Sequence, residues 1–462
     1  MTTEKDLLKT NKKTPPPIVF ILIGLLVTGS IYWRKTHEKP DFQQQLPLNQ
    51  SQSISDRISL GSKILVMMGA TSQKQAGVEA FAAQDYGTAI AQFQTSLQKY
   101  RNDPETLIYL NNAKAGNNVK IAVSVPIGSN LNVAQEMLRG VAQAQDEVNQ
   151  NGGINGVKLQ VEIVNDENAP EIAQQVATEL VNDKRILAVV GHNSSNATLS
   201  AAPVYQQGGL VMVTPTSLAN NLSGLGSYIF RTVPTIRFMA DPLAQYAVKT
   251  VRKTHIAVCL DSQAPDNLSF KDEFVASLAA KGGQMVSTVC DFASPTFNPS
   301  TAIAQAISSG ADGMLLSPHV DRLDRAIDIA RANKGRLSLF GSPTLYTIKT
   351  LETGQSDVNG LVLPVPWHPN STDPFLANAR KLWGGTVNWR TAMAYDATRA
   401  IITGLQQSST RDGLQRVMRS PGFSAMGTSQ IRFLPTGDRV ANPILVQVQY
   451  GSSGYDFVPL QP

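Results

Sequence analysis

From residue 118 onward, apolar and polar positions alternate between the period of strands and the period of helices. Val119–Val125 is an apolar run of strand length, and Val133–Gln150 places its apolar residues on one helical face. Lys158–Val164 then alternates as an edge strand does. This part of the chain continues with a helix at Pro170–Asn182 and apolar strands at Ile186–Gly191 and Leu210–Val213. The repeated strand–helix–strand order predicts a parallel sheet with right-handed crossovers.

The same order begins again after Val233–Pro234. Helices are predicted at about 237–250, 267–280 and 299–309 and at Asp321–Ala332, and strands at His255–Leu260, Met285–Val289, Gly313–Ser317 and Leu337–Phe340. Two such units predict an α/β protein of two lobes with doubly wound parallel sheets. Because ligands of such sheets lie beyond the carboxyl ends of the strands, we expect the cleft just after Val125, Gly191, Val213, Leu260 and Val289.

A mainly apolar segment that no charge interrupts lies near the amino terminus, at residues 18–33. Lys9, Lys12 and Lys13 precede it and Arg34 and Lys35 follow it, which is typical of an uncleaved transmembrane signal anchor within residues 1–39, behind a cytoplasmic tail. A cleaved signal peptide and a buried core helix are the alternatives. The anchor predicts a membrane attachment through this helix, with the remainder of the chain on the periplasmic, or extracytoplasmic, side.

Residues 40–71 are predicted to be a linker, because 40–56 are polar and lack periodicity. Helical spacing of apolar residues within 72–116 predicts an antiparallel pair of helices, at about 73–84 and 87–100. The pattern formed by Gly77, Phe81, Tyr86, Ala89 and Phe93 resembles a single tetratricopeptide repeat, and an ordinary amphipathic hairpin is the alternative. A single repeat cannot bury its own apolar face, so the hairpin must pack on neighbouring sequence.

The charge distribution argues against a nucleic-acid partner. The net charge is +5, but residues 1–39 hold seven basic and three acidic residues, so the remaining chain is close to neutral. The five histidines are scattered and no CxxC pair occurs, so neither a metal site nor a cofactor is expected. Cys259 and Cys290 lie at the ends of predicted strands, where buried free thiols are favoured over a disulfide.

Three stretches of the strand–helix region carry a family resemblance. They are VKIAVSVPIGSN from Val119, AVVGHNSSNATLSAAPVYQQGGLVMVTPTS from Ala188, and YIFRTVP from Tyr228. Their order and spacing resemble those of type I periplasmic binding proteins of the Leu/Ile/Val-binding kind, over residues 118–462. The resemblance implies a two-lobed solute-binding domain that follows the anchor and the hairpin.

The expected domain is crossed three times between its lobes. The restart of the strand–helix rhythm predicts the first crossing near Thr232–Thr235, and the resemblance implies the other two, near Leu363–Pro366 and Ile431–Pro435. One lobe would then hold residues 118–233 and about 366–430, and the other about 236–363 and 434–462.

The resemblance also implies ligand contacts at Ser194, Ser195, Thr216, Ser217 and Asp291. In the amino-acid-binding members, a serine pair at a helix start holds the ligand carboxylate, a position that suits an anion. The turn that contains Thr216 and Ser217 would add hydroxyl and backbone groups, and Asp291 would pair with the ligand ammonium. Each residue also has a structural alternative: a helix cap for the serine pair, a plain turn, or a solvated loop carboxylate.

The expected function is capture of an amino acid or similar small polar solute for an ABC importer, with permease subunits as partners. Leu218 and Pro265 depart from the amino-acid-binding pattern and leave the ligand open. A membrane-anchored ligand-sensing or scaffolding module is the alternative function. His192 stands beside Ser194, but no GxSxG elbow and no acid that would orient the histidine are identified, so no enzyme is predicted.

Overall fold

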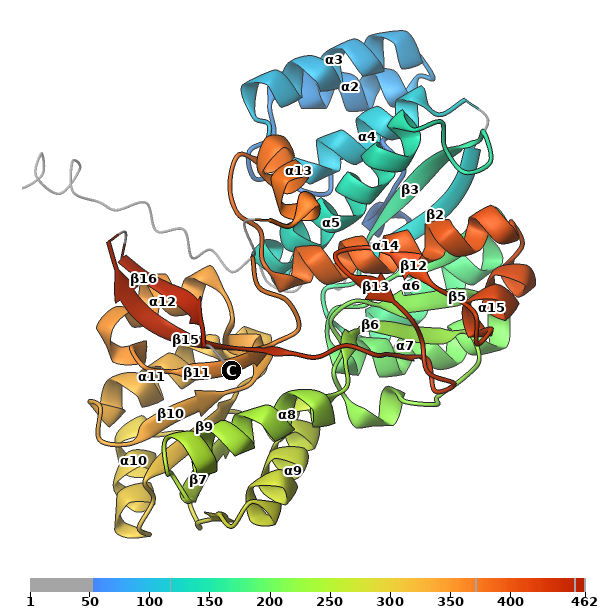
Figure 1. The fold of residues 1–462 in the computed structure, drawn as a ribbon. Coiled ribbons are helices and arrows are strands. Elements are labelled where there is room, and N and C mark those ends of the chain that lie inside the picture. Colours follow the sequence, from blue (N-terminus) through green and yellow to red (C-terminus); the bar gives the residue numbers. More distant parts are fainter. Residues whose placement is uncertain (1–52, 117, 370–371, 453, 461–462) are drawn as a thin grey trace, which may run out of the picture. The chain divides into compact units, whose positions relative to one another are not determined.

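Two seven-stranded β-sheets, each flanked by helices, form the two lobes (Figure 1). The computed structural model describes residues 53–116, 118–369, 372–452 and 454–460. The expected anchor at 18–33 and the linker residues 40–52 lie outside the described residues. Within the described ranges, no helix is both long enough and apolar enough to cross a membrane.

The sheet of lobe 1 has the strand order β1-β3-β2-β4-β5-β6-β14. Its strands are β1 (Ile58–Ser59), β2 (Asn118–Val125), β3 (Lys158–Asn165), β4 (Ile186–Val190), β5 (Val211–Thr214), β6 (Ile229–Pro234) and β14 (Asp438–Arg439). All pair in parallel except β1, which runs antiparallel to β3. The predicted parallel sheet is therefore present, but β3 is not its edge, because β1 covers it.

Helices cover both faces of this sheet (Figure 1). The helices α5 (Leu131–Gln150) and α14 (Trp389–Gln407) share one apolar core with Ile121 and Val123 of β2, whereas α6 (Pro170–Asn182) and α7 (Ser195–Gly208) share another with Ala122. Successive residues of a strand point to opposite faces, so a strand covered on both faces must be apolar throughout. This explains the continuous apolar run of β4 and the apolar residues Val211–Val213 of β5.

The sheet of lobe 2 has the order β16-β15-β11-β10-β9-β7-β8. Its strands are β7 (His255–Leu260), β8 (Gln284–Met285), β9 (Gly313–Ser317), β10 (Ser338–Gly341), β11 (Val362–Val365), β15 (Ile444–Gly451) and β16 (Gly454–Pro459). Its helices are α8 (Ile236–Gln245), α9 (Pro265–Ala280), α10 (Pro299–Ser308), α11 (Leu323–Asn333) and α12 (Ile348–Gly354). The strand expected at Met285–Val289 is shorter than predicted: regular pairing ends at Met285, and Val289 is 81% exposed.

Three chain segments connect the lobes. The first follows β6, and the second lies between β11 and α13 (Pro374–Trp383), both as expected. The expected third crossing at Ile431–Pro435 is wrong. The chain stays in lobe 1 through Arg439, because β14 pairs with β6, and the crossing comes between β14 and β15. Two buried ion pairs hold β14 there, Arg231–Asp438 and Arg439–Asp396.

The segment before the sheets folds onto lobe 1. Helices α2 (Ser72–Ala82) and α3 (Tyr86–Lys99) occupy the predicted hairpin, and α4 (Pro104–Lys114) joins them to α5 and β3. The linker prediction is wrong for residues 54–59, which form a short 3₁₀ helix and β1. Arg57 is buried there and pairs with Glu167 at 3.2 Å. The local sequence did not reveal these pairings, because their partners lie more than 100 residues away.

The two cysteines form a disulfide, with Cα atoms 4.7 Å apart. The expectation of free thiols is therefore wrong. Cys259 lies near the end of β7, and the segment after β8 runs beside that strand in parallel, with Leu260 bridging to Asp291. Two adjacent parallel segments bring the cysteines within bonding distance, although 31 residues separate them in sequence.

Candidate ligand-binding site between the lobes

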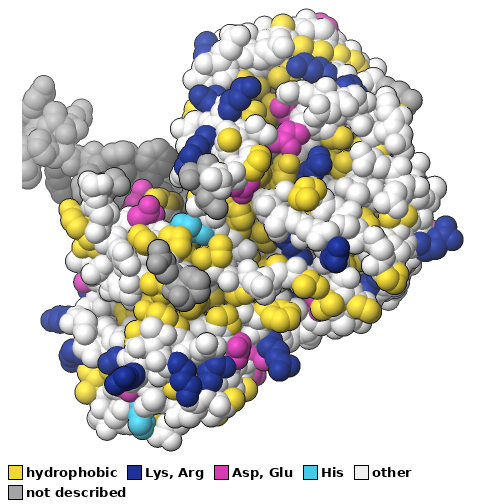
Figure 2. All heavy atoms as spheres, viewed as in Figure 1, with side chains coloured by type: hydrophobic (Ala, Val, Ile, Leu, Met, Phe, Trp, Pro, Cys, Tyr) yellow, Lys and Arg dark blue, Asp and Glu magenta, His cyan; other side chains and the backbone are white. Residues whose placement is uncertain are grey.

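A cavity lies between the two lobes and encloses about 380 Å³ of empty space, part of it open to solvent. Lobe 1 lines it with Asn193, Ser194, Ser195, Thr216, Leu218, Trp389 and Arg390. Lobe 2 contributes Asp266, His319, Val320 and Thr344. Hydrophobic side chains gather in the hollow between the lobes on the face that Figure 2 shows. The cavity therefore combines polar walls from both sheets with apolar surroundings.

Sheet topology explains the place of this cavity. In lobe 1 the five main strands run in the order β3-β2-β4-β5-β6, and in lobe 2 the corresponding order is β8-β7-β9-β10-β11. In each sheet, successive strands are first added on one side and then on the other, and this order reverses at the central pair, β2/β4 or β7/β9. A crevice opens beyond the carboxyl ends of such a pair. Ser194 follows β4, Asp266 follows β7, and His319 follows β9. The cavity lies where the two crevices face each other.

Ser194 and Ser195 begin α7 on the lobe 1 wall. Ser194 is the N-cap, and its Oγ accepts a hydrogen bond from the N–H of Ala197 at 3.3 Å. The Oγ of Ser195 accepts from the N–H groups of Leu218 and Ala219 at 3.2 and 3.3 Å. Both hydroxyls act here as acceptors, so each retains its proton for donation into the cavity. A helix start with two hydroxyl donors suits an anionic group.

Thr216 also lines the cavity, whereas Ser217 does not. The Oγ1 of Thr216 donates to the carbonyl of Asn193 at 2.9 Å, which connects the turn after β5 to the turn after β4. Ser217 is almost fully buried behind this wall. Its hydroxyl lies 3.3 and 3.2 Å from the carbonyl oxygens of His192 and Asn193 and contacts Thr198. Ser217 thus holds the wall in place and does not face the cavity.

A fully buried polar network surrounds His192, just before α7. Its Nδ1 lies 2.6 Å from Asp166 Oδ2 and 3.1 Å from the hydroxyl of Ser124, and its Nε2 lies 3.1 Å from the hydroxyl of Tyr205. The expectation that no acid orients this histidine is wrong, because β3 and β4 flank β2 and bring Asp166 close to His192. Ser194 is not among the hydrogen-bond partners of His192 in the described residues, so the network supports the wall and does not pair His192 with a serine of the cavity lining.

Asp291 lies away from the cavity lining. Its carboxylate accepts hydrogen bonds from the N–H and hydroxyl of Ser262 and from the N–H of Ala293, at 2.6 to 3.0 Å. Burial raises the pKa of Asp291, but these hydrogen bonds outweigh it and the net pKa is lowered. Asp291 follows the edge strand β8, outside the central pair β7/β9. The structure therefore does not bring it together with the serines.

Asp266 and His319 form the charged part of the lobe 2 wall. Asp266 lies in the first turn of α9, and burial raises its pKa while the charge of His319 opposes the rise. Burial lowers the pKa of His319, but its contact with Asp321 at 3.3 Å and the charges of neighbouring aspartates outweigh this, so the net pKa is raised. Lobe 2 thus places a carboxylate and an imidazole opposite the hydroxyls of lobe 1.

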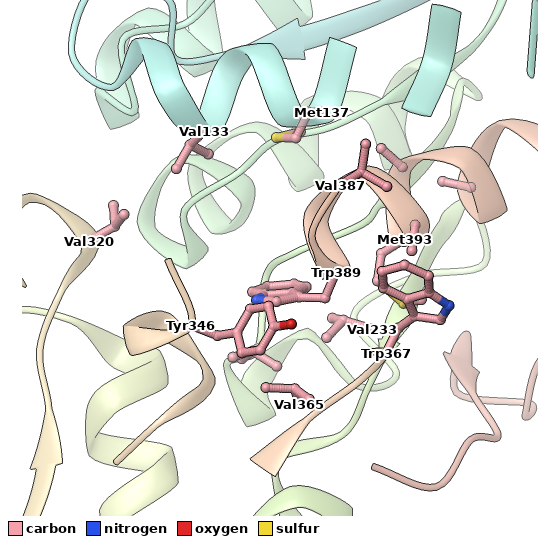
Figure 3. Close-up of a cluster of buried hydrophobic side chains, with 14 of the residues drawn as sticks. Val133, Met137, Val233, Val320, Tyr346, Val365, Trp367, Val387, Trp389 and Met393 are labelled. Carbon is pink, nitrogen blue, oxygen red and sulfur yellow. The ribbon is translucent and has the colours of Figure 1, made fainter. Parts of the chain in front are cut away.

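Trp389 and Arg390 enter the site from the start of α14. Asn388 caps this helix, and its Oδ1 accepts from the N–H of Arg390 at 2.8 Å. The guanidinium carbon of Arg390 lies 4.5 Å from the ring centroid of Trp389, a cation–π contact. Figure 3 shows Trp389 within a buried cluster that also holds Val320 and Tyr346 of lobe 2. This apolar cluster adjoins the cavity and excludes water from its side.

Hydrogen bonds join the lobes beside the cavity. The Nδ2 of Asn196 donates to the carbonyl of Gln263 at 3.2 Å, and the Nδ2 of Asn220 donates to Glu273 Oε1 at 3.0 Å. The N–H of Asn220 donates to the hydroxyl of Ser269 at 3.3 Å. These contacts join α7 and the turns of lobe 1 to α9 of lobe 2 and to the turn before it, so the lobes are closed against each other on this side.

A family model described as periplasmic binding protein matches residues 118–454, more than half of the chain. The chain belongs to the periplasmic binding protein family. The matched range holds both lobes and every residue that lines the cavity. The segment before residue 118, which contains α2, α3 and α4, precedes the match.

Curated relatives of this family member align with part of its length. The Leu/Ile/Val-binding protein of Escherichia coli is 32% identical over 154 residues, which cover 33% of this chain and 42% of that protein. An amino acid binding protein of Pseudomonas aeruginosa is 32% identical over 145 residues, or 31% of this chain and 39% of that one. The aligned part thus spans about two fifths of these curated relatives.

Solved structures resemble the chain over a larger part of its length. A leucine binding protein of Thermotoga maritima has a TM-score of 0.66 at 18% identity and covers 74% of this chain and 99% of that one. A solute binding protein of Rhodopseudomonas palustris, in complex with p-hydroxybenzoic acid, has a TM-score of 0.64 at 20% identity, with coverages of 74% and 96%. At these identities the likeness shows the fold of type I periplasmic binding proteins.

The prediction from sequence missed Asp266, His319 and Arg390. Asp266 could have been found, because it follows Leu260, one of the strand ends where the cleft was expected. His319 follows Ser317, a predicted strand end that was not included. Arg390 gave no comparable signal, since α14 follows no strand directly and reaches the site only after the second crossing.

Proposed function

We propose that this periplasmic binding protein captures an amino acid or a similar small polar solute between its lobes and presents it to an ABC importer. The observation that carries the proposal is the cavity at the two facing crevices, with hydroxyl donors on one wall and Asp266 and His319 on the other. The amino acid and Leu/Ile/Val binding of its partial relatives supports this class of solute.

Closure of the lobes would bind the solute. Ser194, Ser195 and Thr216 belong to lobe 1, whereas Asp266 and His319 belong to lobe 2, so a solute that contacts both groups stabilises only the closed arrangement. In a water-poor cavity, charge-assisted hydrogen bonds contribute about 1.5–3 kcal/mol each. We propose Ser194, Ser195 and Thr216 as the ligand-binding residues of lobe 1.

An extracytoplasmic location, with residues 18–33 as a membrane anchor, completes the proposal. Structural disulfides persist in oxidising compartments, and the Cys259–Cys290 bond fits such a place. Permease subunits of the importer would then contact the closed form at the membrane surface.

A ligand screen tests the capture function. The purified full chain is heated with single amino acids, amides, urea and short peptides, and a true ligand raises the melting temperature by mass action. Ser195→Ala should reduce the shift, while Ser200→Ala should not. Ser200 lies on the same helix but donates to the carbonyl of Pro170 at 2.8 Å, outside the cavity lining. If no solute raises the melting temperature of the wild type, the capture proposal fails.

A ligand-sensing or scaffolding module is the second candidate, and the helices before lobe 1 favour it. Met67, Met68, Tyr86 and Tyr100 are exposed on this segment. Uptake of the identified ligand by cells separates the two functions. Deletion of an importer component abolishes uptake, whereas deletion of a sensor leaves uptake intact and removes a ligand-dependent response.

A further inference from the structure

Arg390 is a buried cation without a counter-ion among the described residues. Arg390 is only 3% exposed, and its Nε has no hydrogen-bond partner among the described residues. Within the described ranges its guanidinium forms no ion pair, and its one side-chain hydrogen bond is a long one of 3.4 Å from Nη1 to the carbonyl of Tyr346. A buried charge is normally paired, because burial without a partner is costly.

Glu136, the acid whose charge acts on Arg390, already has other partners. Glu136 raises the pKa of Arg390 by its charge, but burial dominates and lowers that pKa to about 10. Glu136 instead pairs with Arg139 at 2.7 Å and contacts the hydroxyl of Thr391. With a pKa of about 10, Arg390 keeps its positive charge at neutral pH. The cavity therefore presents a fixed cation with free donor capacity.

We propose that Arg390 is a specificity-determining residue that binds a carboxylate of the captured solute. A guanidinium presents its N–H groups in a planar fork that matches a carboxylate, which an ammonium or a hydroxyl does not. The start of α7 with Ser194 and Ser195 belongs to the same lobe and favours the same charge. Trp389, beneath the guanidinium, holds the fork in position through its ring. This inference rests on the proposed capture function and narrows it to carboxylate-bearing solutes.

The same chemistry is present in amino acids and in simple carboxylic acids, so the test compares both. The full chain is titrated with L-leucine, L-glutamate and benzoate, and with L-leucinamide, L-glutamine and benzamide as partners without one carboxylate. We expect at least one acid to bind and its amide partner to bind at least tenfold more weakly. Leucine or glutamate would identify an amino-acid carboxylate, and benzoate a simple one.

Variants assign the effect to Arg390. Arg390→Gln should weaken the bound acid at least tenfold and leave the weak binding of its amide unchanged, and Arg390→Lys should recover only part of the loss. Arg399→Gln is the matched control. Arg399 lies nine residues further along α14, on the opposite face, and donates to the carbonyl of Met426 at 3.2 Å. An Arg390→Gln variant that binds the acid as the wild type does would overturn the proposal.

A measurement without ligand gives an independent test. Arg390→Met removes an unpaired buried charge and keeps most of the volume, so it should raise the melting temperature of the ligand-free protein. A lower melting temperature would show that Arg390 is a structural residue and would overturn the inference. If neutral solutes bind and no carboxylate does, the carboxylate inference fails while the capture function stands. If no solute binds at all, both fail.

Discussion

The carboxylate of Asp166 lies 2.6 Å from Nδ1 of His192, and both side chains are fully buried. The backbone carbonyl of His192 accepts from the hydroxyl of Thr214 at 2.9 Å, and Ser194 follows two residues later. The pair therefore fixes the segment that carries the lobe 1 wall of the cavity. Its position behind Ser194 and Ser195 makes it a positioning device for the ligand site.

Asp166→Ala should destabilise the protein and weaken ligand binding together. The change leaves the buried Nδ1 of His192 and the hydroxyl of Ser124 without their acceptor, which costs about 2–4 kcal/mol in the free energy of unfolding. Urea unfolding measures the loss, and titration of the identified ligand measures the affinity. Asp272→Ala, at an exposed carboxylate of α9, is the control and should change neither. Equal unfolding midpoints for the two variants would show that the buried pair does not support this wall.

The Cys259–Cys290 bond should stabilise lobe 2. A cross-link between residues 31 positions apart restricts the unfolded chain and contributes about 3–4 kcal/mol by the chain-entropy model. Reduction with dithiothreitol should therefore lower the melting temperature of the wild type. The Cys259→Ser, Cys290→Ser double variant should start lower and not respond to the reductant. A thiol assay on the unfolded, unreduced protein should find no free cysteine, and two free thiols would contradict the bond.

Local pattern was sufficient to predict most strands and helices between residues 118 and 340. The apolar run of β4 follows from burial on both faces of the sheet, and the amphipathic spacing of α5 follows from burial on one face of the helix. Both patterns are visible in a short window of sequence. The restart of the strand–helix order predicted the two lobes, and the resemblance supplied the expected second and third crossings between them. Ser194, Ser195 and Thr216 line the cavity because they follow β4 and β5, which lie inside the sheet, and their role in binding stays a prediction.

The errors concern contacts between distant segments. Asp291 and Asp266 both follow predicted strands of lobe 2, and sequence alone did not tell which strand lies at the edge. Sequence alone also did not show which distant segments are adjacent in the fold. For that reason it did not reveal the disulfide, the pairing of β1 with β3, or the acid that contacts His192. The position of Arg390 depends on the packing of α14 against α5, and no local periodicity of the sequence predicts that packing. Chemistry-bearing residues brought together by long-range packing are therefore the part that required the structure.

Lys74 should be essential for the packing of the helices before lobe 1. Its Nζ lies 2.9 Å from Asp103 Oδ2 and 2.7 Å from Glu105 Oε2, and all three side chains are buried. Lys74→Met leaves two buried carboxylates without their cation, which should cost about 3–5 kcal/mol. Lys99→Met removes an exposed lysine that contacts Gln73 and is the matched control. Hydrogen exchange over α2 and α4 should increase only in the Lys74 variant, and unchanged protection there would contradict the prediction.

Asp266 should destabilise the ligand-free protein at neutral pH. Burial raises its folded-state pKa above the ordinary value of 3.8, so protonation favours the folded state. This contribution is full below pH 3.8 and is lost as the pH rises through the raised folded-state pKa. Asp266→Asn keeps the shape without the charge, and its stability should therefore exceed that of the wild type by an amount that grows as the pH rises from 3.8 through the raised folded-state pKa. Paired unfolding curves across this range measure the difference. The difference in the free energy of unfolding could instead be constant with pH, or the wild type could be the more stable protein at neutral pH. Either result would show that the carboxylate is not destabilising in the closed cavity. Its proposed role opposite the lobe 1 wall would then lose its electrostatic basis.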